Sequence, residues 1–156
     1  MAKRVAFIGH RNIYDRTLRE RLKEVVQNEI NNGCEKFIMG MHGAFDNMAL
    51  SVCRELRNIN KTIEIEVVLT SLNTIKNVSE YVSYSDVFTS IYEIEEVHYK
   101  RQIIVSNQKM IDDSDVLICY VDKNVARSGA KIALKYAEKR GVKIINLFTL
   151  EKSIQL

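Results

Sequence analysis

The feature that most limits the fold of this chain is an alternation of short, almost continuous apolar runs with longer segments of helical periodicity. The apolar runs consist mainly of β-branched and aliphatic residues and cover residues 4–9, 36–40, 63–69, 116–121 and 143–148. Runs of this kind are typical of strands that are covered on both faces, and therefore of a parallel sheet.

Apolar residues recur at helical spacing between these runs. The spacing predicts a helix that has Asp15 as its N-cap and ends at residues 31–33, and further helices over 44–56, 100–113 and 128–140. With right-handed crossovers, this order predicts a Rossmann-like, doubly wound α/β fold, with a mainly parallel sheet of about five strands flanked by helices. We expect one domain over residues 1–156, a size that can bury a full core.

Composition excludes several classes of protein. No apolar run approaches the roughly 20 residues of a membrane span, and the first run is too short for a signal-peptide core. We therefore expect a cytoplasmic protein without a membrane partner. The net charge of +3 comes without a dense basic patch, so a nucleic-acid partner is not expected.

Cysteine and histidine give no sign of a metal or disulfide framework. The three cysteines are widely spaced and form no Cys-x-x-Cys pair, and Cys53 and Cys119 fall at predicted core positions. His10, His42 and His98 lack the spacing of a metal site. We expect no bound metal, no other cofactor and no nucleophilic cysteine.

The turn after the first run is the leading candidate for ligand binding. In a doubly wound sheet, ligands bind outside the carboxyl ends of the strands, near the point where the strand order reverses. Gly9 lets the backbone approach a ligand, His10 follows it, and Arg11 offers a rigid fork of donors suited to phosphate. The alternative is an ordinary turn with a solvated arginine.

A second candidate turn follows the second run. Gly40 and Gly43 allow backbone amides to form a cradle for phosphate or ribose oxygens at a helix N-terminus. Asp46 either accepts hydrogen bonds from ribose hydroxyls or caps the helix. His42 and Phe45 complete the candidate binding residues of this turn.

A third candidate turn, formed by Arg127, Ser128 and Gly129, opens the last predicted helix. Ser128 either caps this helix or binds an anion, and no Gly-x-Gly-x-x-Gly or Walker loop is present. Asn107 lies on the apolar stripe of the preceding helix, where a polar amide needs a partner from a loop or a ligand.

The segment from residue 73 to 99 contains Tyr81, Tyr84, Tyr92 and Tyr99, and residues 85–94 fit either a short strand or a lid. The tyrosines fit ordinary packing over the sheet, an aromatic wall beside a ligand, or an oligomer contact.

Several of these motifs, taken in order, resemble the YpsA-like branch (DUF1273) of the SLOG superfamily. They are Phe-Ile-Gly-His-Arg at 7–11, Gly-Met-His-Gly-Ala-Phe-Asp at 40–46, Asn-Gln-x-Met-Ile-Asp-x-Ser-Asp at 107–115, Ser-Gly-Ala at 128–130 and Ile-Ile-Asn-Leu at 144–147. The resemblance covers nearly the whole chain. It implies a Rossmann-like fold that binds nucleotides or nucleotide-derived signals, including ADP-ribose-like molecules.

The chain departs from the enzymatic branch of that superfamily. Lonely Guy phosphoribohydrolases carry Pro-Gly-Gly-x-Gly-Thr-x-x-Glu, whereas residues 122–130 here lack the paired glycines and the glutamate. Because glycosidic cleavage needs a carboxylate to stabilise positive charge on the ribose, we expect binding without strong catalysis and assign no catalytic residue. The alternatives are an N-glycosidic hydrolase that uses Asp46 or Asp115, and a DprA-like module for single-stranded DNA.

The resemblance also implies how a ligand would lie. Its phosphates would rest on the amides after Gly9, Gly43 and Ser128, with Arg11 and Arg127 neutralising their charge. Asp46 would take the ribose, and a tyrosine of segment 73–99 would stack on the base. Such a protein would act as a sensor in a cell or as a sponge that sequesters a defence signal in a phage, and we expect a homo-oligomer because relatives commonly pair.

Overall fold

The computed structural model describes residues 3–69, 87–90, 99–125 and 128–148. Its six strands form one sheet in the order β4-β3-β2-β1-β5-β6, and every neighbouring pair is parallel. The strands are β1 (Lys3–Gly9), β2 (Cys34–Met39), β3 (Glu64–Leu69), β4 (Val87–Ser90), β5 (Val116–Tyr120) and β6 (Lys143–Asn146). The predicted Rossmann-like α/β fold is confirmed.

The sheet has one strand more than the five predicted. The additional strand, β4, lies at the edge beside β3 and within the segment for which the sequence left a strand or a lid open. It is only four residues long, too short for its apolar pattern to stand out from that of a loop or helix.

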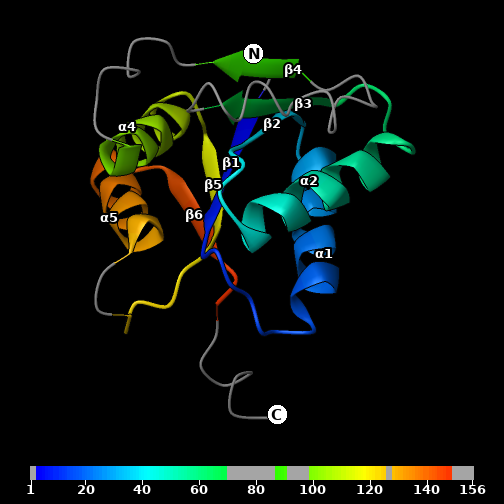
Figure 1. The fold of residues 1–156 in the computed structure, drawn as a ribbon. Coiled ribbons are helices and arrows are strands. Elements are labelled where there is room, and N and C mark those ends of the chain that lie inside the picture. Colours follow the sequence, from blue (N-terminus) through cyan, green and yellow to red (C-terminus); the bar gives the residue numbers. More distant parts are fainter. Residues whose placement is uncertain (1–2, 70–86, 91–98, 126–127, 149–156) are drawn as a thin grey trace.

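The described helices cover the sheet from both sides (Figure 1). α1 and α2 pack together on one face, and α4 and α5 pack together on the other. Their bounds are Leu18–Asn31 for α1, Ala44–Arg57 for α2, Tyr99–Asp112 for α4 and Gly129–Arg140 for α5. None of the described helices has the length and apolar character needed to cross a membrane.

The central strands are buried on both faces, which explains their continuous apolar runs. Val5 and Phe7 of β1 belong to the core under α1 and α2, whereas Ala6 and Ile8 belong to the core under α4 and α5. Cys119 is also fully buried, and this burial raises the pKa of its thiol to about 12. The thiol is therefore a core group and not a nucleophile.

The start of α1 differs from its prediction. The helix begins at Leu18 with Thr17 as its N-cap residue, so Asp15 is not the N-cap. Instead, one carboxylate oxygen of Asp15 accepts hydrogen bonds from the backbone amide of Thr17 at 2.9 Å and from its hydroxyl at 2.7 Å. The other carboxylate oxygen forms an ion pair with Arg21. Arg21 also donates to the carbonyl of Leu147 at 2.7 Å, which ties this loop to the end of the last strand.

The strand order reverses between β1 and β5, which fixes the position of the site. These strands are neighbours, with Gly9 in register with Tyr120, but β1 leads to α1 on one face and β5 leads to α5 on the other. Because the two connections leave in opposite directions, a crevice opens at the carboxyl ends of the two strands.

Candidate functional site

A cavity of about 720 Å³ lies at this crevice. Its volume falls within the range of about 300–1,000 Å³ that is typical of small-molecule sites. The loops after β1 and β5, the first turns of α2 and α5, α4 and the end of the last strand contribute its lining: Ile8, Gly9, His10, Arg11, Asn12, Tyr14, Asp15, His42, Asp46, Ile103, Asn107, Tyr120, Asp122, Val125, Ser128, Gly129, Ala130 and Phe148.

The cavity brings together most of the predicted site residues from three separate turns and one helix. Those that line it are Gly9, His10, Arg11, His42, Asp46, Asn107, Ser128 and Gly129. Gly40, Gly43 and Phe45 are not part of its lining, and Arg127 lies outside the described residues. The binding role of all these residues stays a prediction, but their convergence follows from the sheet order.

The turn after β1 is held in place by the start of α2. The amide of Ala44 donates to the carbonyl of Arg11 at 2.9 Å, and the amide of Phe45 donates to the carbonyl of His10 at 3.4 Å. A Cβ atom on Gly43 would lie 2.5 Å from the Cα of Arg11, so only glycine permits this approach. The amides of Ala44 and Phe45 therefore already bind protein carbonyls, and the phosphate cradle expected after Gly43 stays a prediction that these two amides do not favour.

Phe45 and Gly40 support the pocket from behind. Phe45 is fully buried against Gly9, where an added Cβ would lie 2.4 Å from the Phe45 ring. The Phe45 ring stacks at 6.2 Å on that of Tyr120, which does line the cavity. A Cβ on Gly40 would lie 2.9 Å from the His42 ring, so Gly40 makes room for that side chain.

Asp46 supplies a buried carboxyl group to the wall of the pocket. One of its oxygens accepts a hydrogen bond from the backbone amide of His42 at 2.9 Å. Burial raises the pKa of Asp46 to about 6, and the hydrogen bond opposes this rise only in part. The carboxyl group can therefore gain or lose a proton near neutral pH.

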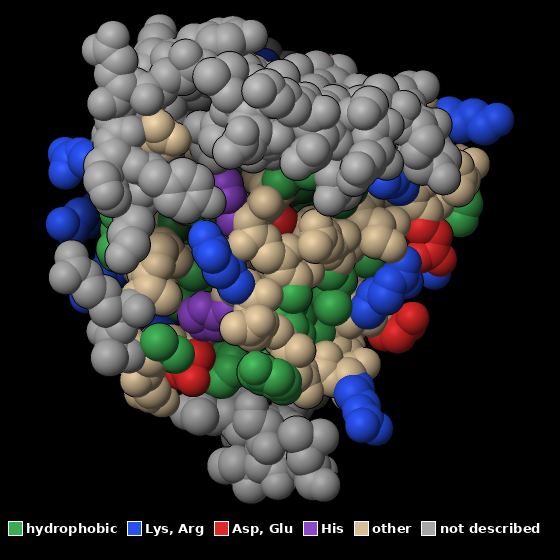
Figure 2. Space-filling view, in the orientation of Figure 1, with side chains coloured by type: hydrophobic (Ala, Val, Ile, Leu, Met, Phe, Trp, Pro, Cys, Tyr) green, Lys and Arg blue, Asp and Glu red, His purple; other side chains and the backbone are tan. Residues whose placement is uncertain are grey.

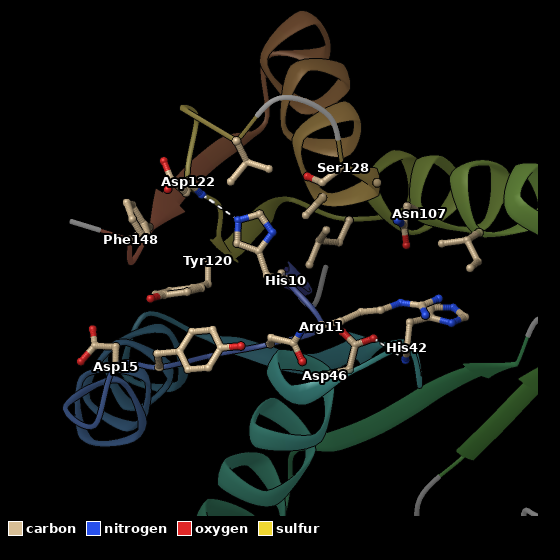
Figure 3. A pocket seen from close by; sticks show the side chains of 18 residues that line it. His10, Arg11, Asp15, His42, Asp46, Asn107, Tyr120, Asp122, Ser128 and Phe148 are labelled. Atoms are coloured by element: carbon tan, nitrogen blue, oxygen red, sulfur yellow. Dashed lines mark hydrogen bonds between the residues drawn. The ribbon is translucent and has the colours of Figure 1, made fainter. Parts of the chain in front are cut away.

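His42 and Arg11 lie next to each other at the same end of the pocket. Arg11 extends across the pocket toward His42 (Figure 3), and Figure 2 shows histidine and basic side chains, purple and blue, close together on this face. Burial, and then the charge of Arg11, lower the pKa of His42. The buried Nε2 atom of His42 has no hydrogen-bond partner among the described residues. Within the same part of the chain, no carboxylate pairs with the exposed guanidinium of Arg11.

His10 occupies the centre of the pocket (Figure 3). Its Nε2 atom accepts a hydrogen bond from the backbone amide of Asp122 at 2.8 Å. Burial lowers the pKa of this imidazole, although the nearby Asp122 carboxylate acts in the opposite direction. The protein environment therefore favours the neutral form of the imidazole.

The first turn of α5 lines the pocket with Ser128, Gly129 and Ala130. The Ser128 hydroxyl accepts a hydrogen bond from the amide of Lys131 at 3.1 Å and thus caps the helix. The next two amides, those of Gly129 and Ala130, have no acceptor within the helix, and both residues line the cavity. This helix end suits an anion. Asn107 of α4 is buried and also lines the cavity.

Sequence reasoning missed the aromatic residues that line the opposite end of the cavity. The rings of Tyr120 and Phe148 meet edge to face, with centroids 5.3 Å apart, and Tyr14 lies nearby with 83% of its surface exposed. The signal was available for Tyr120, because the last residue of a strand lies at the sheet edge where ligands bind. The tyrosines expected to form this wall, Tyr81, Tyr84 and Tyr92, lie outside the described residues, as does the side chain of Tyr99.

Two carboxylates lie at the aromatic end, and both have protein partners. Asp15 pairs with Arg21, and Asp122 accepts a hydrogen bond from the amide of Asn124 at 2.9 Å. Across the described residues, no three histidine, cysteine, aspartate or glutamate side chains are grouped so that they could hold a metal ion.

Comparison with protein-family models and with curated proteins gives no match to this chain. The resemblance to the SLOG superfamily therefore stays an inference from the motifs, and the site has to be interpreted from its own chemistry.

Proposed function

We propose that this protein binds a nucleotide or a nucleotide-derived signal, such as an ADP-ribose-like molecule or a cyclic nucleotide, in the pocket between β1 and β5. The observation that carries the proposal is the polarity of the pocket. One end has Tyr120 and Phe148, and the other has Arg11 and His42, with the start of α5 beside them. A nucleotide has the same division into a flat aromatic part and an anionic part.

The anionic part of the ligand would lie between Arg11 and α5. Arginine offers planar donors that match phosphate oxygens, and the amides of Gly129 and Ala130 add donors at the positive end of a helix dipole. The Ser128 hydroxyl already accepts from the Lys131 amide, but its own proton remains available to a ligand oxygen.

The aromatic part would lie against Tyr120 and Phe148. Flat rings gain about 0.5–1.5 kcal/mol from such contacts beyond the burial of their area. The carboxylates of Asp15 and Asp122 lie at this end and can accept hydrogen bonds from the amino group of a base or from ribose hydroxyls.

The charges of the pocket favour ligands with few phosphates. Arg11 is the cationic side chain in the described lining, whereas Asp15, Asp46 and Asp122 are acidic. These three acidic side chains would repel a triphosphate, and a single arginine compensates little of this repulsion. We therefore expect nucleoside monophosphates, cyclic nucleotides and ADP-ribose to bind more tightly than ATP.

The proposal is tested by thermal unfolding of the purified protein with AMP, cyclic AMP, ADP-ribose and ATP, beside mass spectrometry of any ligand released on denaturation. A ligand at about 100 times its Kd adds about 2.7 kcal/mol to the free energy of unfolding, which should raise Tm by about 5 °C or more. Arg11→Gln should abolish most of this shift. Arg16→Gln, at an exposed arginine outside the cavity lining, is the matched control. No shift with any of these compounds, and no released ligand, would contradict the proposal.

A second candidate function, hydrolysis of the N-glycosidic bond, is favoured by one observation. Asp46 supplies a buried carboxyl group with a pKa of about 6 to the pocket, which suits an acid, a base or a group that stabilises positive charge on the ribose. Incubation with nucleoside monophosphates followed by chromatography for free base tests it. Steady base release that is lost in Asp46→Asn would establish the enzyme and contradict binding alone.

A further inference from the structure

The hydrogen bond between His10 and Asp122 determines which ring nitrogen of His10 carries the proton. A backbone amide can only donate, so the Nε2 atom that lies 2.8 Å from the Asp122 amide has to be the unprotonated nitrogen. In a neutral imidazole the proton then resides on Nδ1. The Tyr120 ring lies nearly perpendicular to the imidazole, with the two ring centroids 6.1 Å apart, and this contact limits the rotation of the His10 ring.

The Nδ1 atom points away from Asp122 and into the cavity (Figure 3). His10 lies between the aromatic end of the pocket, with Tyr120 and Phe148, and the end that contains Arg11. A ligand that spans both ends has to pass this N–H group.

We infer that His10 is a specificity-determining residue, locked by the Asp122 amide as the Nδ1–H tautomer, that donates one hydrogen bond to an acceptor atom in the middle of the bound ligand. This inference rests on the proposed function for the identity of the ligand, but the tautomer itself does not. The Nδ1–H donor of His10 selects ligands that have a phosphate, ether or carbonyl oxygen, or an unprotonated ring nitrogen, at this position. It disfavours ligands with a donor there, because two donors would face each other at a half-buried position.

The protein environment supports the neutral form of His10. Burial lowers its pKa, and the Asp122 carboxylate only partly offsets this effect. Protonation would place a second N–H group opposite the Asp122 amide and break the bond that orients the ring.

The tautomer is tested in the free protein by nitrogen-15 NMR of the imidazole rings. A protonated, pyrrole-type Nδ1 and an unprotonated, pyridine-type Nε2 are expected for His10 at pH 7.5. The opposite assignment, or rapid averaging between the two tautomers, would overturn the inference whether or not any nucleotide binds.

Two variants separate the two nitrogen positions. His10→Gln places an acceptor near the Nε2 position and keeps the bond to the Asp122 amide, but it lacks the Nδ1 donor. His10→Asn places a donor near the Nδ1 position and loses the bond to Asp122.

We expect His10→Gln to retain the wild-type Tm and to bind AMP or ADP-ribose about five- to tenfold more weakly in calorimetry. His10→Asn should have a lower Tm but a smaller loss of affinity. Wild-type affinity in His10→Gln would overturn the inference. If neither compound binds the wild-type protein, the proposed function fails and with it the role of His10 toward these ligands, whereas the tautomer is still decided by the NMR assignment.

Discussion

Two helices begin at the edge of the pocket, and the protein uses their first turns differently. The first amides of α2, those of Ala44 and Phe45, donate to the carbonyls of Arg11 and His10. The first amides of α5, those of Gly129 and Ala130, line the cavity. Both helices follow a strand of the sheet and have a glycine at their start, Gly43 as the N-cap residue of α2 and Gly129 as the first residue of α5, so they look alike in the sequence.

The comparison shows that the first amides of a helix can hold a neighbouring loop, as at α2, or line a cavity, as at α5. At α2, the dipole and the free amides stabilise the loop that carries His10 and Arg11. At α5, the Ser128 hydroxyl accepts a hydrogen bond from the Lys131 amide, and the amides of Gly129 and Ala130 remain available to a ligand. One helix therefore shapes the pocket, and we expect the other to hold the anion.

The largest expected effect follows from the glycines at these two helix starts. Gly43→Ala would bring a Cβ to 2.5 Å from the Arg11 Cα, whereas a Cβ on Gly129 would have no atom within 4 Å. We expect Gly43→Ala to lower the free energy of unfolding by about 3 kcal/mol through overpacking. It should also displace the His10–Arg11 loop and remove ligand binding.

Gly129→Ala is the matched control. It should leave stability unchanged or raise it by about 0.5–1 kcal/mol, because alanine favours helix. Urea unfolding of both variants measures these effects. Equal stability of the two variants would contradict the distinct roles assigned to α2 and α5.

The second effect concerns the buried carboxyl group at the start of α2. The folded-state pKa of Asp46, about 6, lies above its ordinary value of 3.8. The fold therefore prefers the protonated form, and stability should rise as the pH falls from about 6 to about 4. The difference between these two pKa values lowers the free energy of unfolding by about 3 kcal/mol above pH 6.

Asp46→Asn removes the charge and keeps an acceptor for the His42 amide. We expect this variant to be about 2–3 kcal/mol more stable than wild type at pH 7.5 and equal to it near pH 4. His10 and His42 have lowered pKa values, so they contribute stability above pH 6.5 that is lost on acidification. Both histidines are present in the wild type and in the variant, so the difference in stability between these two proteins reports the effect of Asp46. A less stable Asp46→Asn at pH 7.5 would contradict this account.

The smallest effect concerns the cap of α5. Ser128→Ala removes the acceptor of the Lys131 amide and should cost about 1 kcal/mol. Ser128→Asn keeps a capping side chain and should stay within about 0.5 kcal/mol of wild type. Thermal unfolding of both variants measures the cap, and a Ser128→Ala protein as stable as wild type would exclude it.

The sequence predicted the fold well because its central strands are buried on both faces. Residues 4–9 and 116–121 form continuous apolar runs for this reason, and the rule for ligand sites in doubly wound sheets then selects the edge at which the cavity lies. Asn107 was predicted as a site residue because an amide on an apolar helix stripe needs a partner. The edge strand β4, with four residues, has too little pattern to be distinguished.

The remaining errors concern contacts between segments that are distant in the sequence. Nothing in the residues around Gly43 shows that its neighbours would be the carbonyls of His10 and Arg11, more than 30 positions earlier. The aromatic end of the pocket was missed for the same reason, since Tyr120 and Phe148 meet only because β5 and β6 are adjacent.

The central claim is that an anionic ligand binds between Arg11 and the start of α5 and not at the start of α2. Titration of the nitrogen-15-labelled protein with ADP-ribose, followed by amide NMR, tests it most directly. We expect the largest shifts at the amides of Gly129 and Ala130 and at the His10–Arg11 turn, with the amides of Ala44 and Phe45 nearly unchanged. Shifts that are largest at Ala44 and Phe45, or absent throughout, would contradict the claim.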